Sequence, residues 1–184
     1  MVKLHQIGIL TMGLLLASFG TVEAQQGVSN AQIVGLFEVP FSAQLTGTAI
    51  GIPVPGFPNP PTIEIIGTFD FVKSPPQLDL VSATINHFLD VTGQYFHSHD
   101  GTFVLVAADG ATLIGSFLGA IRPPIPADPL GRGHSYWLIT NGTGRFAGAM
   151  GSGDFTSELG IGAGGSETAI LKWKGVVAIP DPRP

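Results

Sequence analysis

The residues best suited to chemistry lie together in one short segment, residues 95–100, which reads YFHSHD. Successive side chains of a strand point to opposite faces, so His97 and His99 would project from the same face. Two imidazoles on one face can bind one metal ion, but a site needs further ligands. His87 and His134 are the histidines that could supply a third. We take His97, His99 and His134 as the predicted metal ligands.

The same segment has a plainer interpretation. It would be the polar end of a strand that runs into a turn at Asp100-Gly101. Barrels that use a His-x-His pair expect a glutamate a few residues later, and the residues after Asp100 read GTFVL. We therefore expect no cofactor, and keep a metal-dependent enzyme as a third hypothesis.

Glu64 and Tyr136 are the two candidates for acid-base catalysis. Glu64 lies in a strand pattern and could point into a cavity or to water, with water the default for a carboxylate. An inward Glu64 would have a raised pKa and could act as a base in a cyclisation. Tyr136 and Trp137 would point to opposite faces, so one of them meets the interior. Neither a nucleophile elbow nor a phosphate-binding loop is found in the sequence.

The elements that would position these residues are strands. Residues 63, 65, 67, 69 and 71 are Ile, Ile, Gly, Phe and Phe, with mostly polar residues between them, which is the period of a strand with one buried face. The chain has 26 glycines and 15 prolines and no long helical periodicity. Asp109-Gly110 and Asn141-Gly142 are typical of hairpin turns, and the second predicts a return strand over 145–158.

Eight or nine such strands in one chain predict an all-β domain, a single antiparallel eight-stranded β-barrel in preference to a sandwich. Two proline-rich segments, Gly51–Pro61 and Arg122–Gly133, are predicted loops, because proline prevents pairing with the sheet. They would line the mouth of the barrel if they lie at one end, and are plain connectors otherwise.

The N-terminus is typical of a secretory signal peptide, with a basic Lys3, an apolar stretch over 7–17 and a small-residue exit before Gln25. We predict a signal peptide over 1–24, a barrel domain over 25–178 and a flexible tail over 179–184. The apolar stretch is too short to span a bilayer, so we expect no membrane association after cleavage. The chain has no cysteine, which favours a secreted or periplasmic bacterial protein.

Charge limits the partners. The formal net charge is -5, so the basic surface that nucleic acid requires is missing. Only 11% of residues are charged, which leaves little to keep apolar strand faces apart and predicts a homo-oligomer.

Residues 139–155, ITNGTGRFAGAMGSGDF, resemble the G-G-T-G-x-F-x-x-A-x-G signature of the dirigent and allene oxide cyclase-like barrels, with Asn141 in place of the first glycine. Residues 100–119 are similar to the strand pair that precedes it. The resemblance implies an eight-stranded barrel with an apolar cavity. In those enzymes the cavity holds a reactive small molecule and directs its cyclisation or coupling. The matched residues build the turn and the core, so no catalytic residue is transferred from them.

Two function classes stay open. The first is an exported barrel that binds an apolar small molecule, with steering of its cyclisation or coupling as the enzymatic form. The second is a non-catalytic secreted structural or interaction module. An interior filled by Phe69, Phe71, Phe103, Phe117 and Trp173 would argue against the first.

Overall fold

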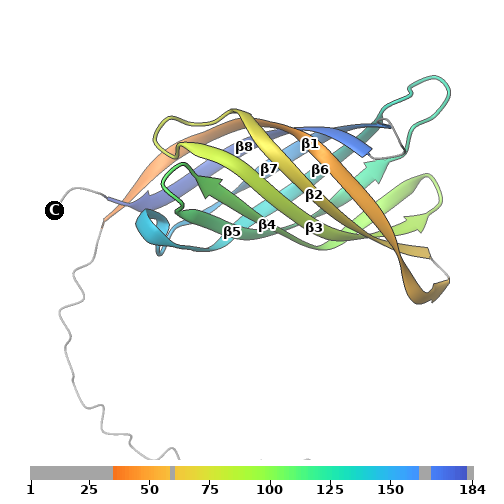
Figure 1. Ribbon diagram of the computed structural model, residues 1–184, viewed down its shortest axis with the longest axis horizontal. Helices are drawn as coiled ribbons and strands as arrows, with labels where there is room; N and C mark the ends of the chain where they lie inside the picture. Colours follow the sequence, from red (N-terminus) through yellow and green to blue (C-terminus); the bar gives the residue numbers. More distant parts are fainter. Residues whose placement is uncertain (1–34, 59–60, 162–166, 182–184) are drawn as a thin grey trace, which may run out of the picture. The chain divides into compact units, whose positions relative to one another are not determined.

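The computed structural model describes residues 35–58, 61–161 and 167–181, which form a closed antiparallel β-barrel. The strands follow one another round the barrel in chain order, and β8 closes the ring on β1 (Figure 1). This confirms the predicted eight-stranded fold. The elements are β1 (Leu36–Pro58), β2 (Pro61–Lys73), β3 (Leu80–Thr92), β4 (Tyr95–Ala107), β5 (Thr112–Arg122), β6 (Gly131–Gly142), the 3-10 helix η1 (Gly144–Phe146), β7 (Met150–Ile161) and β8 (Glu167–Pro180).

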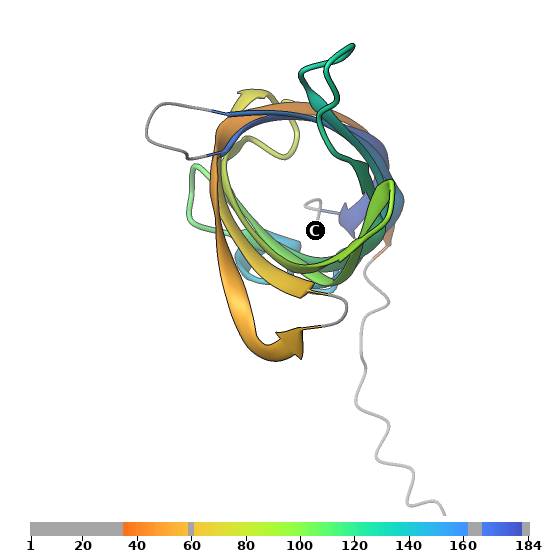
Figure 2. The same cartoon turned by 90° about the vertical axis from the view of Figure 1, so that its right-hand side faces the viewer.

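The alternation read from the sequence has the expected consequence in β2. Ile65, Gly67 and Phe69 are buried inside the barrel, whereas Thr68 and Asp70 are exposed. Because the side-chain period of a strand is two, one face of β2 meets the interior and the other meets solvent. Looking along the barrel, Figure 2 shows the strands as a ring around that interior.

Aromatic side chains fill one part of the interior. The Trp173 ring stacks on Phe155 at 4.7 Å between centroids and meets Phe103 edge-on at 5.0 Å. Phe41 meets Trp137 edge-on at 5.4 Å. Offset and edge-on pairs of this kind add to the free energy gained by burial. We call the region built on these five rings the closed half.

Glycine makes room for the rings of the closed half. A Cβ on Gly153 would lie 2.0 Å from the carbonyl oxygen of Lys174 and 2.7 Å from the Trp137 ring. Gly175 faces the same ring, and a Cβ there would lie 2.5 Å from it. The backbone of β7 and β8 therefore approaches the indole more closely than any other residue type would permit.

The first predicted hairpin is confirmed. Gly110 has φ 84°, and its N–H donates to the Ala107 carbonyl at 2.9 Å. The Asp109 carboxylate accepts from the Ala111 N–H at 3.0 Å, which is the local bond expected of Asp in a turn.

The second predicted hairpin is wrong in its return strand. After β6 the chain enters η1, and β7 begins only at Met150 instead of Arg145. Gly144 has φ 57°, which turns the chain, and Phe146 is fully buried beneath the barrel end. Burial of that ring requires a compact turn between the strands. Arg145 then closes the turn through an ion pair with Asp109 at 2.9 Å.

β4 runs without a break through the predicted turn at Asp100-Gly101. Asp100 has φ 50°, and the register with β5 shifts between Ser98 and Gly101, so the strand carries a bulge. The bulge changes which residues face inward: Ser98 and Gly101 are both buried, whereas His97 is exposed.

The described part of the first proline-rich segment, residues 51–58, is not a loop but continues β1. Residues 51–53 pair with β2, and after a register shift Pro58 pairs with Pro61. Among the described residues, pairing of β1 with β8 ends at Ala49, and beyond that point β1 pairs with β2 alone. Proline lacks the N–H that a second neighbour would need, and an edge strand tolerates it. The prediction that proline prevents pairing is therefore wrong for this segment.

The second proline-rich segment is a shorter loop than predicted, because Arg122 belongs to β5 and residues 131–133 belong to β6. Residues 123–130 connect these strands and carry an isolated bridge between Ile125 and Asp128. Figure 1 shows this connection and the β1–β2 hairpin at the same end of the barrel. Both proline-rich segments therefore lie at one end of the barrel, where they can line a shared mouth.

The chain ends differ from the predicted tail. Ile179 and Pro180 belong to β8, where Pro180 pairs with Leu36 and Ile179 is buried. The barrel therefore extends past residue 178, because β1 offers a partner there. The predicted signal peptide, 1–24, lies outside the described residues, as do 182–184. In the part of the chain that the structure describes, no helix has the length and apolar character needed to cross a lipid bilayer.

Candidate functional site

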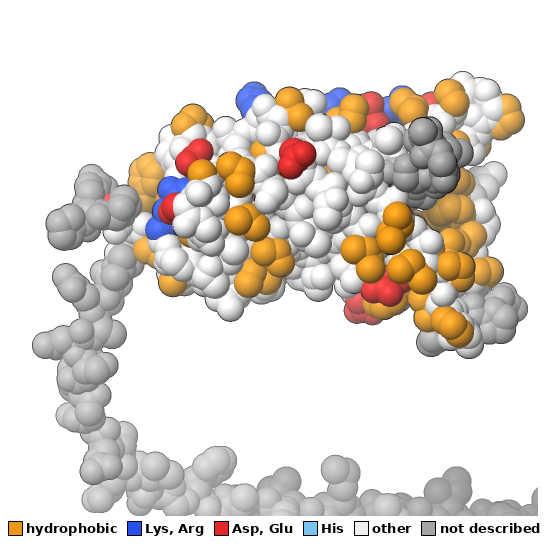
Figure 3. Space-filling model, in the orientation of Figure 1, with side chains coloured by type: hydrophobic (Ala, Val, Ile, Leu, Met, Phe, Trp, Pro, Cys, Tyr) orange, Lys and Arg blue, Asp and Glu red, His pale blue; other side chains and the backbone are white. Residues whose placement is uncertain are grey.

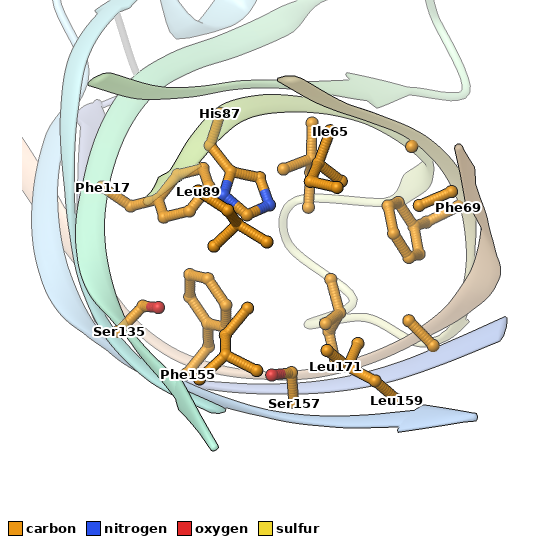
Figure 4. Close-up of a pocket in the computed structure, with 15 residues that line it drawn as sticks. Ile65, Phe69, His87, Leu89, Phe117, Ser135, Phe155, Ser157, Leu159 and Leu171 are labelled. Atoms are coloured by element: carbon orange, nitrogen blue, oxygen red, sulfur yellow. The ribbon is translucent and has the colours of Figure 1, made fainter. Parts of the chain in front are cut away.

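The remainder of the interior is hollow. It holds a cavity of about 50 Å³, into which the labelled side chains of Figure 4 point from different sides of the ring. We call this region the open half. Its lining is Ala49, Ile65, Gly67, Phe69, Ile85, His87, Leu89, Phe117, Ile121, Ser135, Phe155, Ser157, Leu159, Ala169 and Leu171.

A wider space of about 190 Å³ lies at the end of the open half, and we call it the mouth. Both proline-rich segments contribute to it, with Pro53 from β1 and Pro123 and Pro124 from the β5–β6 connection. Leu89 and Leu159 line both the mouth and the cavity, so the two spaces adjoin. The other lining residues of the mouth are Gly51, Ile63, Ile65, Phe96, Ile121 and Gly160.

One imidazole reaches the cavity. His87 of β3 is 8% exposed, and its ring lies 5.3 Å from that of Phe117. The Ser98 Oγ lies 2.7 Å from His87 Nδ1, a hydrogen bond between β3 and β4. Burial lowers the pKa of His87 to about 4, because the charged imidazolium would lose its hydration. His87 is thus neutral near pH 7.

Two serines face His87 across the cavity. Ser135 of β6 and Ser157 of β7 are buried, and Figure 4 shows both hydroxyls directed at the cavity. Among the described residues, neither hydroxyl has a side-chain or backbone hydrogen-bond partner. Glycines provide their space: a Cβ on Gly119 would lie 2.2 Å from Ser135 Oγ, and one on Gly133 would lie 2.3 Å from Ser157 Oγ.

This arrangement is that of a ligand pocket. Such pockets are mainly apolar, with a small number of polar groups that set the orientation of the ligand. Here the polar groups are one neutral imidazole and two free hydroxyls. No Asp, Glu, Lys or Arg lines the cavity or the mouth within the described ranges.

The predicted acid-base candidates lie on the outer surface. The Glu64 carboxylate accepts a hydrogen bond from the Asn86 side-chain amide at 2.9 Å, on the solvent side of β2 and β3. Tyr136 is 62% exposed, and the Trp137 side chain fills the interior instead. The structure therefore brings neither Glu64 nor Tyr136 to the cavity.

The predicted metal ligands are also on the outer surface. His97 and His99 are in β4 and His134 is in β6, with β5 between them. His97 pairs with Ala120 and Ala120 with His134, so two strand spacings, roughly 9–10 Å, separate these backbones. In the described part of the chain no three His, Asp or Glu side chains form a group suited to a metal ion. A metal site on these histidines stays a prediction.

His99 instead joins two carboxylates. Its Nδ1 lies 2.9 Å from Asp100 and its Nε2 lies 3.4 Å from Asp90. The bond to Asp100 raises the pKa of His99. A hydrogen bond from Thr62, at 2.8 Å, lowers the pKa of Asp90, and His99 adds to that effect.

The sequence patterns do not indicate most of the cavity. They point to His87 only as a possible third metal ligand, and they do not single out Ser98, Ser135 or Ser157. A signal exists for His87, because it lies between Ile85 and Leu89 in the inward series of β3. The interior position of Ser98 depends on the β4 bulge, which no pattern in the sequence predicts.

Comparison with known proteins adds a distant structural likeness. No protein-family model matches the chain, and no curated protein matches it at a significant level. Among solved structures, the chain is similar to a pterocarpan synthase dirigent protein, with 14% sequence identity, a TM-score of 0.46, and alignment over 87% of this chain and 100% of that one. A likeness at this level carries no argument about function, and the barrel fold rests on the strand pairing described above.

Proposed function

We propose that the barrel binds an apolar small molecule in its open half. The observation that carries the proposal is the cavity itself: it is lined by apolar side chains, opens to the mouth, and contains three polar groups. A filled interior would have opposed binding. Of the aromatic residues that could fill it, Phe103 and Trp173 lie in the closed half, whereas Phe69 and Phe117 line the cavity wall.

The size of the space suits a small ligand. The inner cavity, about 50 Å³, has room for one end of a molecule, and the mouth, about 190 Å³, for the rest. An apolar protein cavity of about 150 Å³ binds benzene, and the mouth is of that order of size.

Titration with ethylbenzene tests the proposal. Saturable chemical-shift changes at cavity residues are expected in NMR spectra of the purified chain. Ala169→Leu places extra methyl groups in the cavity, and we expect it to weaken binding about tenfold or more, since the ligand loses its space. Ala178→Leu, on the outward face of the same strand, is the matched control. Absence of saturable binding, or equal affinity in both variants, contradicts the proposal and favours the non-catalytic module.

The proposal extends to steering a reaction. A rigid cavity restricts the conformations of a bound molecule, which favours one mode of cyclisation or coupling over others. The likeness of residues 139–155 to the dirigent and allene oxide cyclase-like signature supports this extension. No side chain is assigned to the chemistry. A change in product distribution when a reactive precursor is bound would be the measurement.

We also propose a homo-oligomer and an extracytoplasmic location. Figure 3 shows a face of the barrel with few charged side chains, and the outer surface of β5 and β6 exposes Leu118, Tyr136 and Leu138. Light scattering should give a mass above that of one chain, and Leu118→Lys should reduce it. Recovery of exported protein beginning at Gln25 would support the signal peptide.

A further inference from the structure

The polar groups of the open half are found only at its inner end. On β3, Leu89 lines the mouth, and His87 is the next inward-facing residue. On β7, Leu159 lines the mouth and Ser157 is the next. Two residues of a strand advance about 7 Å. A molecule that enters therefore passes an apolar collar before it reaches a hydrogen-bonding group.

The route carries no charge. Every side chain of the mouth is apolar, and within the described ranges no acidic or basic side chain lines the cavity. A carboxylate or ammonium group brought to this depth would lose its water without gaining a counter-ion, which is strongly unfavourable. A neutral oxygen can replace its water by the protein groups present.

His87 is the central one of these groups. Ser98 Oγ engages Nδ1 at 2.7 Å, which leaves Nε2 as the ring nitrogen for a ligand, and Figure 4 shows the imidazole projecting into the cavity. The partner at Nδ1 determines which nitrogen carries the proton. Ser98 is thus a positioning residue, and His87 is the contact.

We infer that the ligand is a neutral, largely apolar molecule with one carbonyl or hydroxyl oxygen, that it enters oxygen first, and that His87 binds this oxygen. The inference rests on the proposed function and narrows its ligand class. Its physical basis is the order of chemistry along the route: apolar at the mouth, polar and uncharged at the inner end.

Four probes of one shape test it at pH 7.5: ethylbenzene, acetophenone, 1-phenylethanol and benzoate. The affinity of each is measured by NMR titration of the full chain and of His87→Phe. We expect the variant to weaken acetophenone or 1-phenylethanol about fivefold, the effect of one hydrogen bond, and to leave ethylbenzene unchanged or tighter. Benzoate should bind at least about tenfold more weakly than acetophenone. Comparison of the affinities of acetophenone and 1-phenylethanol shows whether His87 prefers a carbonyl or a hydroxyl oxygen.

Two further measurements keep the test decisive if His87→Phe fails to fold. In the unmodified chain, acetophenone or 1-phenylethanol should shift the His87 Nε2 resonance, whereas ethylbenzene should not. Ser98→Ala should alter the ratio of the two ring-nitrogen tautomers, with Thr102→Val, an outward hydroxyl on the same strand, as the control.

The outcomes separate the two proposals. If no neutral probe saturates, the proposed function fails, and the inference fails with it. Suppose that ethylbenzene binds and that Ala169→Leu weakens its binding. If His87→Phe then has the same effect on the affinity of all three neutral probes, and the Nε2 resonance does not distinguish them, only the inference is overturned. Benzoate binding as tightly as acetophenone also overturns it.

Discussion

The two halves of the barrel interior are built from the same strands and reach opposite ends. On β8, Trp173 belongs to the closed half and Leu171, two residues away, lines the cavity. On β7, Phe155 stacks on Trp173 from one side and lines the cavity with the other. The floor of the cavity is thus a wall of the aromatic core. A rigid packed end allows the other end to stay hollow without collapse of the barrel.

The halves also differ in polarity. The closed half brings five aromatic rings together, whereas the open half contains His87, Ser135 and Ser157 among apolar side chains. The Ser135 and Ser157 hydroxyls face the cavity instead of packed protein, so they are available to a bound molecule. The following predictions, from the largest expected effect to the smallest, test the division between a stabilising half and a binding half.

Trp173→Ala should destabilise the protein most. The side chain is fully buried among four aromatic partners, and its loss would leave a large cavity, so we expect a decrease of about 3–5 kcal/mol in the free energy of unfolding. Urea denaturation measures it. Val72→Ala, on the exposed face of β2, is the control and should change little. A small effect of Trp173→Ala would mean that the closed half does not stabilise the barrel.

His87 should make stability depend on pH. Its pKa is about 4 in the folded chain and about 6.5 when unfolded, so between these values the unfolded state binds a proton that the folded state does not. The free energy of unfolding should therefore fall by about 3 kcal/mol as pH decreases from 6.5 to 4. His87→Phe should lack this component.

The pH dependence of the free energy of unfolding is best compared between the unmodified chain and His87→Phe. His99 acts with the opposite sign, because its raised pKa gives stability that is lost as pH rises. This contribution is common to both proteins and cancels in the difference, except for the repulsion between His99 and His87, which is part of the His87 effect. Equal pH dependence in the two would contradict a buried, neutral His87.

Substitution of Ser98 and of Ser157 by alanine should affect stability differently. Ser98→Ala removes the hydroxyl bonded to His87 and should cost about 1–2 kcal/mol of stability. Ser157→Ala removes a buried hydroxyl without a protein partner, so stability should be unchanged or higher by about 0.5 kcal/mol. Thermal unfolding of the two variants side by side measures the contrast. Similar losses in both would show that Ser157 has a structural bond.

Leu159→Phe should have the smallest effect on stability. Leu159 is half-buried at the mouth, where a larger ring occupies open space and displaces no packed side chain, so we expect a change within about 0.5 kcal/mol. The rate of ethylbenzene association, however, should fall because the mouth narrows. Unaltered association would indicate another entry route.

Much of the fold was predictable from local patterns. The alternation at Ile65 and Phe69, and the Asp109-Gly110 turn, depend on a few neighbouring residues and were confirmed. The predictions that failed depend on distant partners. Pro53 lies in a strand because β8 ends its pairing at Ala49 and leaves an edge, and residues 145–149 form a turn because Phe146 is buried at the barrel end.

The site was less predictable than the fold, and the β4 bulge shows why. Counted back from Phe103, strict alternation would put residues 99 and 97, both histidines, inside the barrel. The bulge at Asp100 shifts the phase by one residue, which leaves His97 and His99 outside and places Ser98 inside beside His87. A single inserted residue thus exchanged the expected site for the observed one.

The sequence by itself determined that the chain forms strands, where several of them turn, and that few charges would cover their outer faces, because these properties follow from side-chain period, glycine conformation and composition. The tertiary structure alone decided which inward positions meet a packed wall and which meet a space. That outcome depends on the register of strands distant in sequence. The barrel closed at one end by tryptophan and phenylalanine, and open at the other beside His87, exists only once all eight strands are paired.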